Sequence, residues 1–227
     1  MLTGIGAPTA WPFFQKARKP QPARTPLGQF QATLTDILDL PSLVDMDAGE
    51  VVIVSTASDS AAASPTVEVT IDANVLTQDI AFVGGGNLLG TMNHWVCPAA
   101  TFNMQVTATW TAGVPGYVSM VVCKVTNLTG VFNEQKTAAF ASTGNPDSGI
   151  TSLYPEPGFH YGAICLIGKS SDALGAWQNG MSAGTRVGSL AVHLDHKTGY
   201  KISNGPAQAQ ILGQAARQCV ALIGHYG

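Results

Sequence analysis

The stretch from Leu88 to Val125 constrains the fold most, because it contains two different strand patterns separated by a turn. From Phe102 to Trp110, apolar residues alternate with Asn, Gln and Thr, which is the period of a strand with one buried face. A turn rich in glycine and proline follows. Tyr117–Val125 is then a β-branched run that becomes apolar on both faces. The stretch predicts a half-buried strand followed by a more deeply buried one.

Strand patterns recur in most of the remaining chain, whereas helical periodicity is limited to two short segments. A helical turn is expected in Thr33–Leu43 and a short helix around Ala173–Met181. At 227 residues the chain fits one large all-β domain. The further strands expected are Val51–Ser55, Thr66–Asp72, Phe159–Ile167, Val187–Leu194 and Arg217–Tyr226.

Charged residues are unusually few, at 11% of the chain, whereas 45% of the residues are apolar. Much of the surface is therefore uncharged, and we expect part of it to be covered by partners. The net charge of −3 disfavours nucleic-acid binding by the chain as a whole, so any such contact must be local. No apolar run is long enough to predict a membrane span.

Residues 1–50 are expected to form an extended N-terminal arm with a short helical turn, and residues 51–227 to form the folded domain. Prolines in the first 30 residues remove hydrogen-bond donors and fix φ, so this arm has no core of its own. Its basic residues are either phosphate contacts or the solvated part of a linker, and the sequence leaves both interpretations open. The candidate RNA contacts are Lys16, Arg18, Lys19 and Arg24, and the candidate intersubunit contacts are Trp11, Phe13, Phe14 and Trp177.

Side chains used in catalysis or metal binding form no recognisable motif. The four cysteines are far apart and mostly lie in or beside apolar runs, which favours buried, reduced thiols over a zinc site. His193, Asp195 and His196 are the tightest group of ligand-type residues, but in a strand His196 faces away from the other two. His94 and Cys97 remain a formal base and nucleophile pair, without a helix N-terminus to activate the thiol. The sequence therefore predicts no enzyme activity and neither a metal nor a cofactor.

The order TVEVTIDA, Leu88-Leu89-Gly90, FNMQVTATWT and YVSMVVCKV resembles the major capsid proteins of picorna-like viruses, most of all the small-subunit, plant-infecting members of the secovirid type. The resemblance implies an eight-stranded antiparallel jelly-roll sandwich, with two facing sheets in the strand orders B-I-D-G and C-H-E-F. It makes Thr66–Asp72, Phe102–Trp110 and Arg217–Tyr226 strands B, D and I. Tyr117–Val125 and Phe159–Ile167 become strands E and F, while strand G has no evident counterpart.

The same resemblance implies a structural coat protein. Such a subunit assembles with copies of itself or with sister subunits into an icosahedral shell around single-stranded RNA, so the expected places are the virion and, during assembly, the host cytoplasm. The RNA contacts would be non-specific, and no membrane is involved. The alternative is a lectin-like or receptor-binding jelly-roll module. That module needs a concave site with aromatic and polar groups, for which Trp95, Trp177 and Tyr154 are the candidates.

Overall fold

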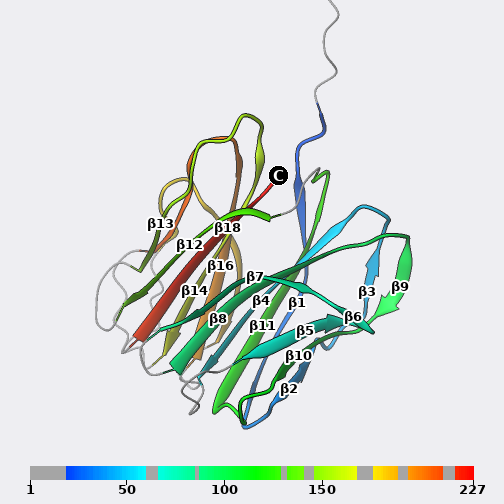
Figure 1. The fold of residues 1–227 in the computed structure, drawn as a ribbon, viewed down its shortest axis with the longest axis vertical. Helices are drawn as coiled ribbons and strands as arrows, with labels where there is room; N and C mark the ends of the chain where they lie inside the picture. The colour runs from blue at the N-terminus through cyan, green and yellow to red at the C-terminus, as the bar shows by residue number, and fades with distance from the viewer. Residues whose placement is uncertain are drawn as a thin grey trace, which may run out of the picture.

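The computed structural model describes residues 19–59, 66–84, 87–128, 132–140, 146–167, 176–188, 194–211 and 218–227. Every element of secondary structure named in these ranges is a strand, and every strand pairing is antiparallel, which confirms the all-β class (Figure 1). The strands are β1 (Ala23–Thr33), β2 (Ile37–Asp39), β3 (Val44–Met46), β4 (Val51–Asp59), β5 (Val67–Ile71), β6 (Asn74–Val75), β7 (Thr77–Val83), β8 (Leu88–Val96), β9 (Thr101–Met104), β10 (Val106–Trp110), β11 (Tyr117–Thr126), β12 (Phe132–Phe140), β13 (Asp147–Ile150), β14 (Gly158–Ile167), β15 (Ser182–Gly188), β16 (Leu194–Ser203), β17 (Gln208–Gln210) and β18 (Gln218–Tyr226).

Two five-stranded sheets form the centre of the molecule. Their strand orders are β1-β11-β4-β8-β7 and β12-β18-β14-β16-β15. A four-stranded sheet, β2-β10-β5-β6, covers the first of them, and the β13-β17 pair covers the second. β3 and β9 form a further two-stranded sheet.

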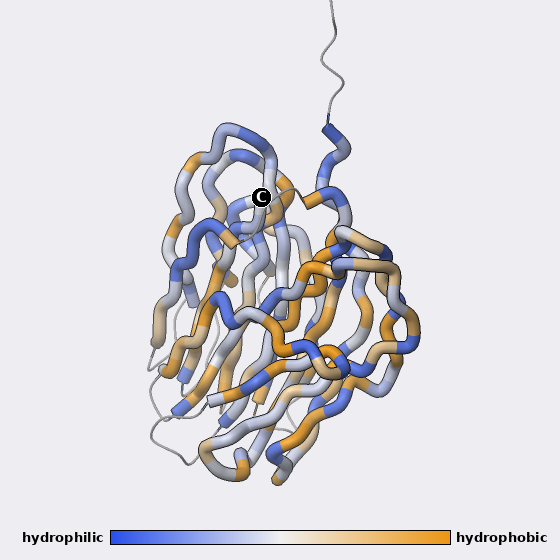
Figure 2. Tube along the Cα trace, turned by 45° about the vertical axis from the view of Figure 1, so that its right-hand side comes forward, coloured by the Kyte–Doolittle hydropathy of each residue, from blue (hydrophilic) through white to orange (hydrophobic). Residues whose placement is uncertain are grey.

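Apolar cores separate these layers of strands (Figure 2). Along β4, Val52 and Val54 belong to the core shared with the four-stranded sheet, whereas Val51 and Ile53 belong to the core between the two five-stranded sheets. Another core, which includes Ile164, lies between the second five-stranded sheet and β17. The central strands are therefore covered on both faces, and this explains why β4, β11, β14 and β18 are apolar runs with little alternation.

The two halves of the chain arrange their strands in the same order. In each five-stranded sheet, the strand that comes first in the chain pairs with the one that comes last, and the last pairs with the second. The order β1-β11-β4 therefore corresponds to β12-β18-β14. The order then continues as β8-β7 in one half and β16-β15 in the other. The small sheets correspond too, because Trp177 bridges Ile211 beside β17, in the place that β5 takes beside β10. We call residues 23–126 the first unit and residues 132–226 the second unit.

From Ala23 onward, the predicted arm is part of the first unit. β1 is an edge strand that pairs with β11 along its whole length. Pro26 is tolerated there because the register shifts between Pro26 and Gly28, and a bulge at a sheet edge needs no amide donor. The segment is bound by backbone hydrogen bonds that a proline count does not predict.

Both helical expectations are wrong where the structure describes them. In Thr33–Leu43, Leu38 is buried whereas Ile37 is 51% exposed, which is the alternation of a strand, and β2 pairs with β10. The described part of Ala173–Met181 contains the β-bridge of Trp177 and is not helical. In both places pairing with a distant strand overrides a weak local preference.

The expected grouping of strands into sheets is also wrong in part. β10 and β11 do lie in different sheets, and β5 pairs directly with β10. However, β18, the expected strand I, does not share a sheet with β5, the expected strand B. The expected strands E and F, which are β11 and β14, also lie in different sheets. The alternation over Phe102–Trp110 is divided at Gln105 into β9 and β10, close to Asn103 with its φ of 56°. Alternation identifies strands, but pairing depends on contacts between residues far apart in the chain.

Candidate functional site

A pocket of about 590 Å³ is lined by the end of β18 and by the segment that leads into β1. Figure 1 shows these two segments at the same end of the molecule. Its walls come from the segment before β1, the connection between β11 and β12 with the start of β12, the loop before β14, and the end of the chain at β18 and Gly227. Pockets of this size are typical of small-ligand sites. The lining residues are Lys19, Pro20, Gln21, Pro22, Asn127, Asn133, Tyr154, Pro155, Glu156, Pro157, His225 and Gly227.

Two aromatic side chains, Tyr154 and His225, line this pocket, and His160 packs against His225 outside the lining. His160 and His225 are register partners on β14 and β18, and their ring centroids lie 4.6 Å apart. The Tyr154 ring stacks on His225, with centroids 3.5 Å apart and planes 6° apart. Gly158 makes room for this arrangement, because a methyl group there would overlap His225 Nε2 and approach the Tyr226 carbonyl oxygen to 2.7 Å. The stack therefore depends on strand register and on one glycine.

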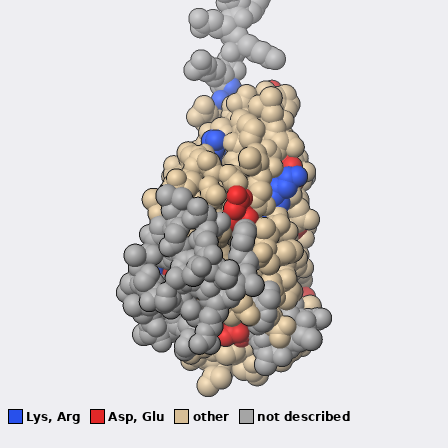
Figure 3. All heavy atoms as spheres, turned by 90° about the vertical axis from the view of Figure 1, so that its left-hand side faces the viewer, with Lys and Arg blue, Asp and Glu red and all other residues tan. Residues whose placement is uncertain are grey.

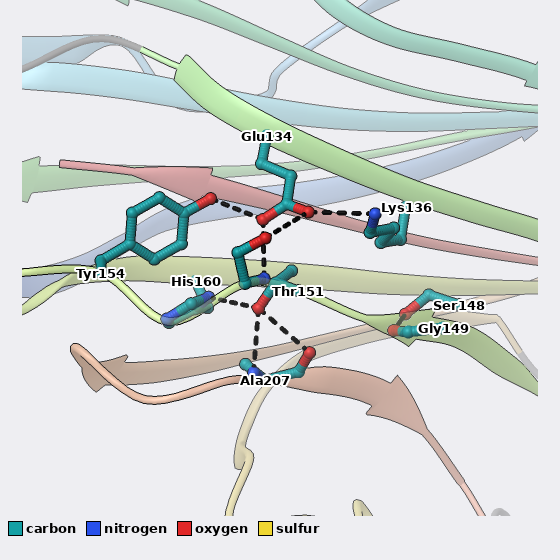
Figure 4. A network of polar contacts seen from close by, with 9 residues as sticks. Glu134, Lys136, Ser148, Gly149, Thr151, Tyr154, His160 and Ala207 are labelled. Carbon is teal, nitrogen blue, oxygen red and sulfur yellow. Dashed lines mark hydrogen bonds and ion pairs between the residues drawn. The ribbon is translucent and has the colours of Figure 1, made fainter.

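Glu134 on β12 holds Tyr154 in place (Figure 4). Tyr154 donates its hydroxyl hydrogen to Glu134 Oε2 at 2.6 Å, and the Ser152 amide donates to the same oxygen at 2.7 Å. The Ser152 hydroxyl donates to Oε1 at 3.1 Å, and Lys136 Nζ lies 3.0 Å from it. One carboxylate thus connects β12 to the loop before β14.

The environment fixes the charges of these groups. Burial opposes ionisation of Glu134, but the donors on Tyr154, Ser152 and Lys136 outweigh it and lower the pKa of the carboxyl group to about 2. Burial lowers the pKa of His160 to about 4, and the nearby His225 contributes to that shift. Burial also lowers the pKa of His225 to about 4, against the opposing effect of Glu134. At neutral pH the carboxylate is charged and both imidazoles are neutral.

The hydrogen bonds define which nitrogen of each imidazole carries the proton. His160 Nε2 donates to the Ser203 carbonyl at 3.2 Å. His225 Nδ1 lies 3.2 Å from Asn133 Nδ2, an amide nitrogen that can only donate, so His225 carries its proton on Nε2. This buried Nε2 has no hydrogen-bond partner among the described residues. An unsatisfied buried donor of this kind is rare.

The rim of the pocket is polar but has little net charge. Lys19 Nζ and Glu156 Oε2 lie 3.2 Å apart across it, and both side chains are well exposed. Asn127 Nδ2 donates to the Gln21 carbonyl at 3.1 Å. This bond fixes the Asn127 side chain and does not involve its Oδ1. The residues that the structure describes in the lining include no Ser, Thr or Cys that could act as a nucleophile. The arrangement can bind and orient a ligand.

The structure separates the residues that the sequence grouped as basic or aromatic contacts. Lys19 lies at the pocket, whereas Arg24 turns inward, where Nη2 donates to Thr185 Oγ1 at 3.0 Å and the guanidinium lies 5.2 Å from the Tyr200 ring centroid. Trp177 packs against the core beside β17 and is half-buried. The predicted residues Trp11, Phe13, Phe14, Lys16, Arg18 and His193 lie outside the described residues.

His196 lies between the two five-stranded sheets. Its Nε2 is 2.9 Å from Ser55 Oγ, and its Nδ1 is 3.1 Å from Ser119 Oγ. Burial lowers the pKa of His196 to about 4, although Asp195 acts in the opposite direction. Asp195 itself pairs with Arg186 on β15. His196 therefore links the two units, and it forms no ligand group with Asp195.

The hypothetical pair of His94 and Cys97 is not formed. His94 Nδ1 lies 2.7 Å from Asp79 Oδ1, and Tyr226 donates its hydroxyl hydrogen to Asp79 Oδ2 at 2.9 Å. The Cys97 thiol donates to the Ala99 carbonyl at 2.9 Å. All four cysteines are buried and free, as the sequence predicted.

The pocket was not predicted from the sequence, although Tyr154 was among the aromatic candidates for a concave site. Of the other residues that build it, Glu134 and Asn133 belong to a polar stretch without a recognisable motif. His160 and His225 each stand next to a tyrosine, which was a local sign of a buried histidine. Their contact depends on the β14-β18 register, which no local pattern contains.

Comparison of the sequence with models of known protein families and with curated proteins finds no match. Among the described residues, no three His, Cys, Asp or Glu side chains gather in a way that could hold a metal ion. The same part of the chain contains no helix that is long and apolar enough to span a membrane.

Proposed function

We propose that the chain is a structural coat-protein subunit that assembles with copies of itself, or with sister subunits, into an icosahedral shell around single-stranded RNA. The observation that carries the proposal is the strand order of the first unit. When β1, β2, β4, β5, β6, β8, β10 and β11 are lettered B to I in chain order, the two sheets read B-I-D-G and C-H-E-F. This order agrees with the one that the resemblance implies for a jelly roll and so supports the proposal, with β7 as an additional strand beside G.

The second unit supports the same proposal. Lettered in the same way, β12, β18, β14 and β16 read B-I-D-G, and β13 beside β17 reads C-H. We therefore propose two jelly rolls in tandem, in place of the single eight-stranded one expected from the sequence.

The surface supports assembly as well. The face in Figure 3 carries few charged side chains among its described residues. Leu34, Phe102 and Leu153 are 79%, 66% and 70% exposed, respectively. Interfaces are depleted in charge, and large exposed apolar side chains mark surfaces that partners cover.

Arg24 is not part of the proposed RNA contacts, because its guanidinium donates to Thr185 within the protein. It rests on Lys16, Arg18 and the exposed Lys19. A few charges per subunit give little affinity alone, but repetition over many subunits adds up through multivalency.

Sedimentation velocity and negative-stain electron microscopy of the purified full chain test the proposal. Uniform large particles with a nucleic-acid absorbance are the expected result. A small species that stays small at every protein concentration would exclude self-assembly. Particles that form only after a second jelly-roll protein is added would point to a sister subunit instead.

A further inference from the structure

We propose that the pocket at the end of β18 binds a neutral carbohydrate of about one or two sugar rings. This inference is independent of the shell proposal, because it rests on the pocket alone. The volume of about 590 Å³ lies within the usual range for small-ligand sites and is far too small for a folded partner.

The charges of the pocket favour a neutral ligand. Among the described residues of its lining, the charged side chains are Lys19 and Glu156, which pair at 3.2 Å and cancel one another. His225 contributes no charge at neutral pH, and the Glu134 carboxylate already accepts from Tyr154, Ser152 and Lys136. An anion would meet Glu156, and a cation would meet Lys19, and the other described side chains of the lining add no charge of either sign at neutral pH.

The hydrogen-bonding groups suit hydroxyls, which both donate and accept. Asn127 and Asn133 each use the amide nitrogen in an internal bond, so their oxygens are acceptors that these bonds leave free. The Nε2–H of His225 is buried against Gly158, outside the lining, so it is not among the groups that meet the ligand. A ligand with hydroxyl groups can donate to the two asparagine oxygens, whereas a purely apolar ligand would leave them unsatisfied.

The remaining lining suits the C–H faces of a sugar ring. Four of the lining residues are prolines, from the segment before β1 and from the loop before β14. Tyr154 adds an aromatic ring, of which His225 covers one face and Glu134 fixes the hydroxyl. Both features are in place without the ligand, so binding costs little ordering of the site.

Isothermal titration of the full chain with maltose, cellobiose, lactose and N,N′-diacetylchitobiose tests the proposal, with uridine and glucose 6-phosphate as competing chemistries. We expect at least one of the four disaccharides to bind saturably, with a Kd of about 1 mM or tighter. N133A removes one acceptor and releases His225, so it should weaken that binding by about tenfold. N74A changes an exposed asparagine on β6, outside the pocket, and should leave the affinity unchanged.

A second variant tests whether misfolding, and not the loss of a specific contact, weakens sugar binding. E156Q keeps the shape of the rim but removes its negative charge, and it should retain the sugar while admitting glucose 6-phosphate. Circular dichroism and a thermal melt establish that each variant is folded. The proposal is overturned if none of the four disaccharides binds at about 20 mM, if only uridine binds, or if the folded N133A variant binds as tightly as the natural protein.

Discussion

The ring of Tyr154 lies on the ring of His225 with centroids 3.5 Å apart and planes 6° apart, and this stack joins a loop to the end of β18, an inner strand of a five-stranded sheet. Each of the two rings has its own hydrogen-bond partner. Glu134 binds the Tyr154 hydroxyl, and Asn133 binds the His225 ring. The pocket is therefore mainly a property of the second unit, to which the segments just before and just after the first unit add one wall.

G158A should destabilise the protein, because its methyl group would overlap His225 Nε2 and crowd the Tyr226 carbonyl oxygen. Neither group can move without disturbing the β14-β18 ladder, so we expect a loss of roughly 1–3 kcal/mol in the free energy of unfolding, as for other overpacked sites. Urea denaturation measures it. G205A is the control, since its nearest neighbour would be Ser203 Oγ at 4.0 Å. Equal stability of the two variants would contradict the packing described for His225.

Y154F should raise the pKa of Glu134 from its value of about 2, because it removes the hydroxyl that donates to Oε2. The lowered pKa means that Glu134 contributes to stability above its ordinary value of 4.5 and that this contribution is lost as the pH falls from 4.5 toward 2. In Y154F the contribution should be smaller, with a cost of about 1 kcal/mol at neutral pH for the lost hydrogen bond. Carboxyl ¹³C shifts of Glu134 followed by NMR against pH measure the change, and an unaltered titration would refute the role of Tyr154.

Local patterns in the sequence predicted several of the long strands but missed β12 and β16, because burial on one or both faces sets the alternation within a strand only where that burial is regular. Val67–Ile71 and Gly158–Ile167 are examples. They could not predict which strands pair, since pairing is decided between residues far apart in the chain. Ala23–Thr33 was missed because its prolines and exposed residues read as an arm, whereas its backbone bonds to β11 supply the order. The pocket was missed for the same reason, because Tyr154 and His225 are brought together by the fold alone.

Acid should destabilise the seam between the two units through His196. Its pKa of about 4 in the folded protein lies below the ordinary value of about 6.5, so the unfolded chain binds more protons between these values and stability falls as the pH drops through that range. For His196 alone the loss between pH 8 and pH 5 is about 2 kcal/mol. His160 and His225 act in the same direction. Urea midpoints measured at pH 8 and pH 5 test the effect.

H196N isolates the contribution of His196, because asparagine keeps polar atoms near Ser55 and Ser119 but does not titrate. The variant should be less stable than the natural protein at pH 8, and the difference should narrow by pH 5. A difference that is constant across this range would mean that His196 does not take up the proton.

R24M should weaken the protein itself and leave its RNA content unchanged. Arg24 on β1 donates to Thr185 and stacks near Tyr200, so its side chain joins the first unit to the second. Loss of these contacts should lower the free energy of unfolding by roughly 1–2 kcal/mol. Denaturation and the ratio of absorbance at 260 and 280 nm are measured on the same preparation. A fall in RNA content with unchanged stability would return Arg24 to the RNA contacts expected from the sequence.

Deleting residues 1–18 is the appropriate test of the arm, because it removes Lys16 and Arg18 but keeps β1 intact. In the shell proposal, the deletion should lower the amount of packaged RNA and the dependence of packaging on salt, since fewer phosphates are neutralised for each subunit. Replacement of both basic residues by glutamine in the full chain should have the same effect if charge is the cause. A deletion of residues 1–30 would also remove most of β1 and uncover β11, so it should yield unfolded protein and cannot separate RNA binding from folding. Unchanged packaging after the shorter deletion would remove these two residues from the RNA contacts and leave the arm a role in assembly.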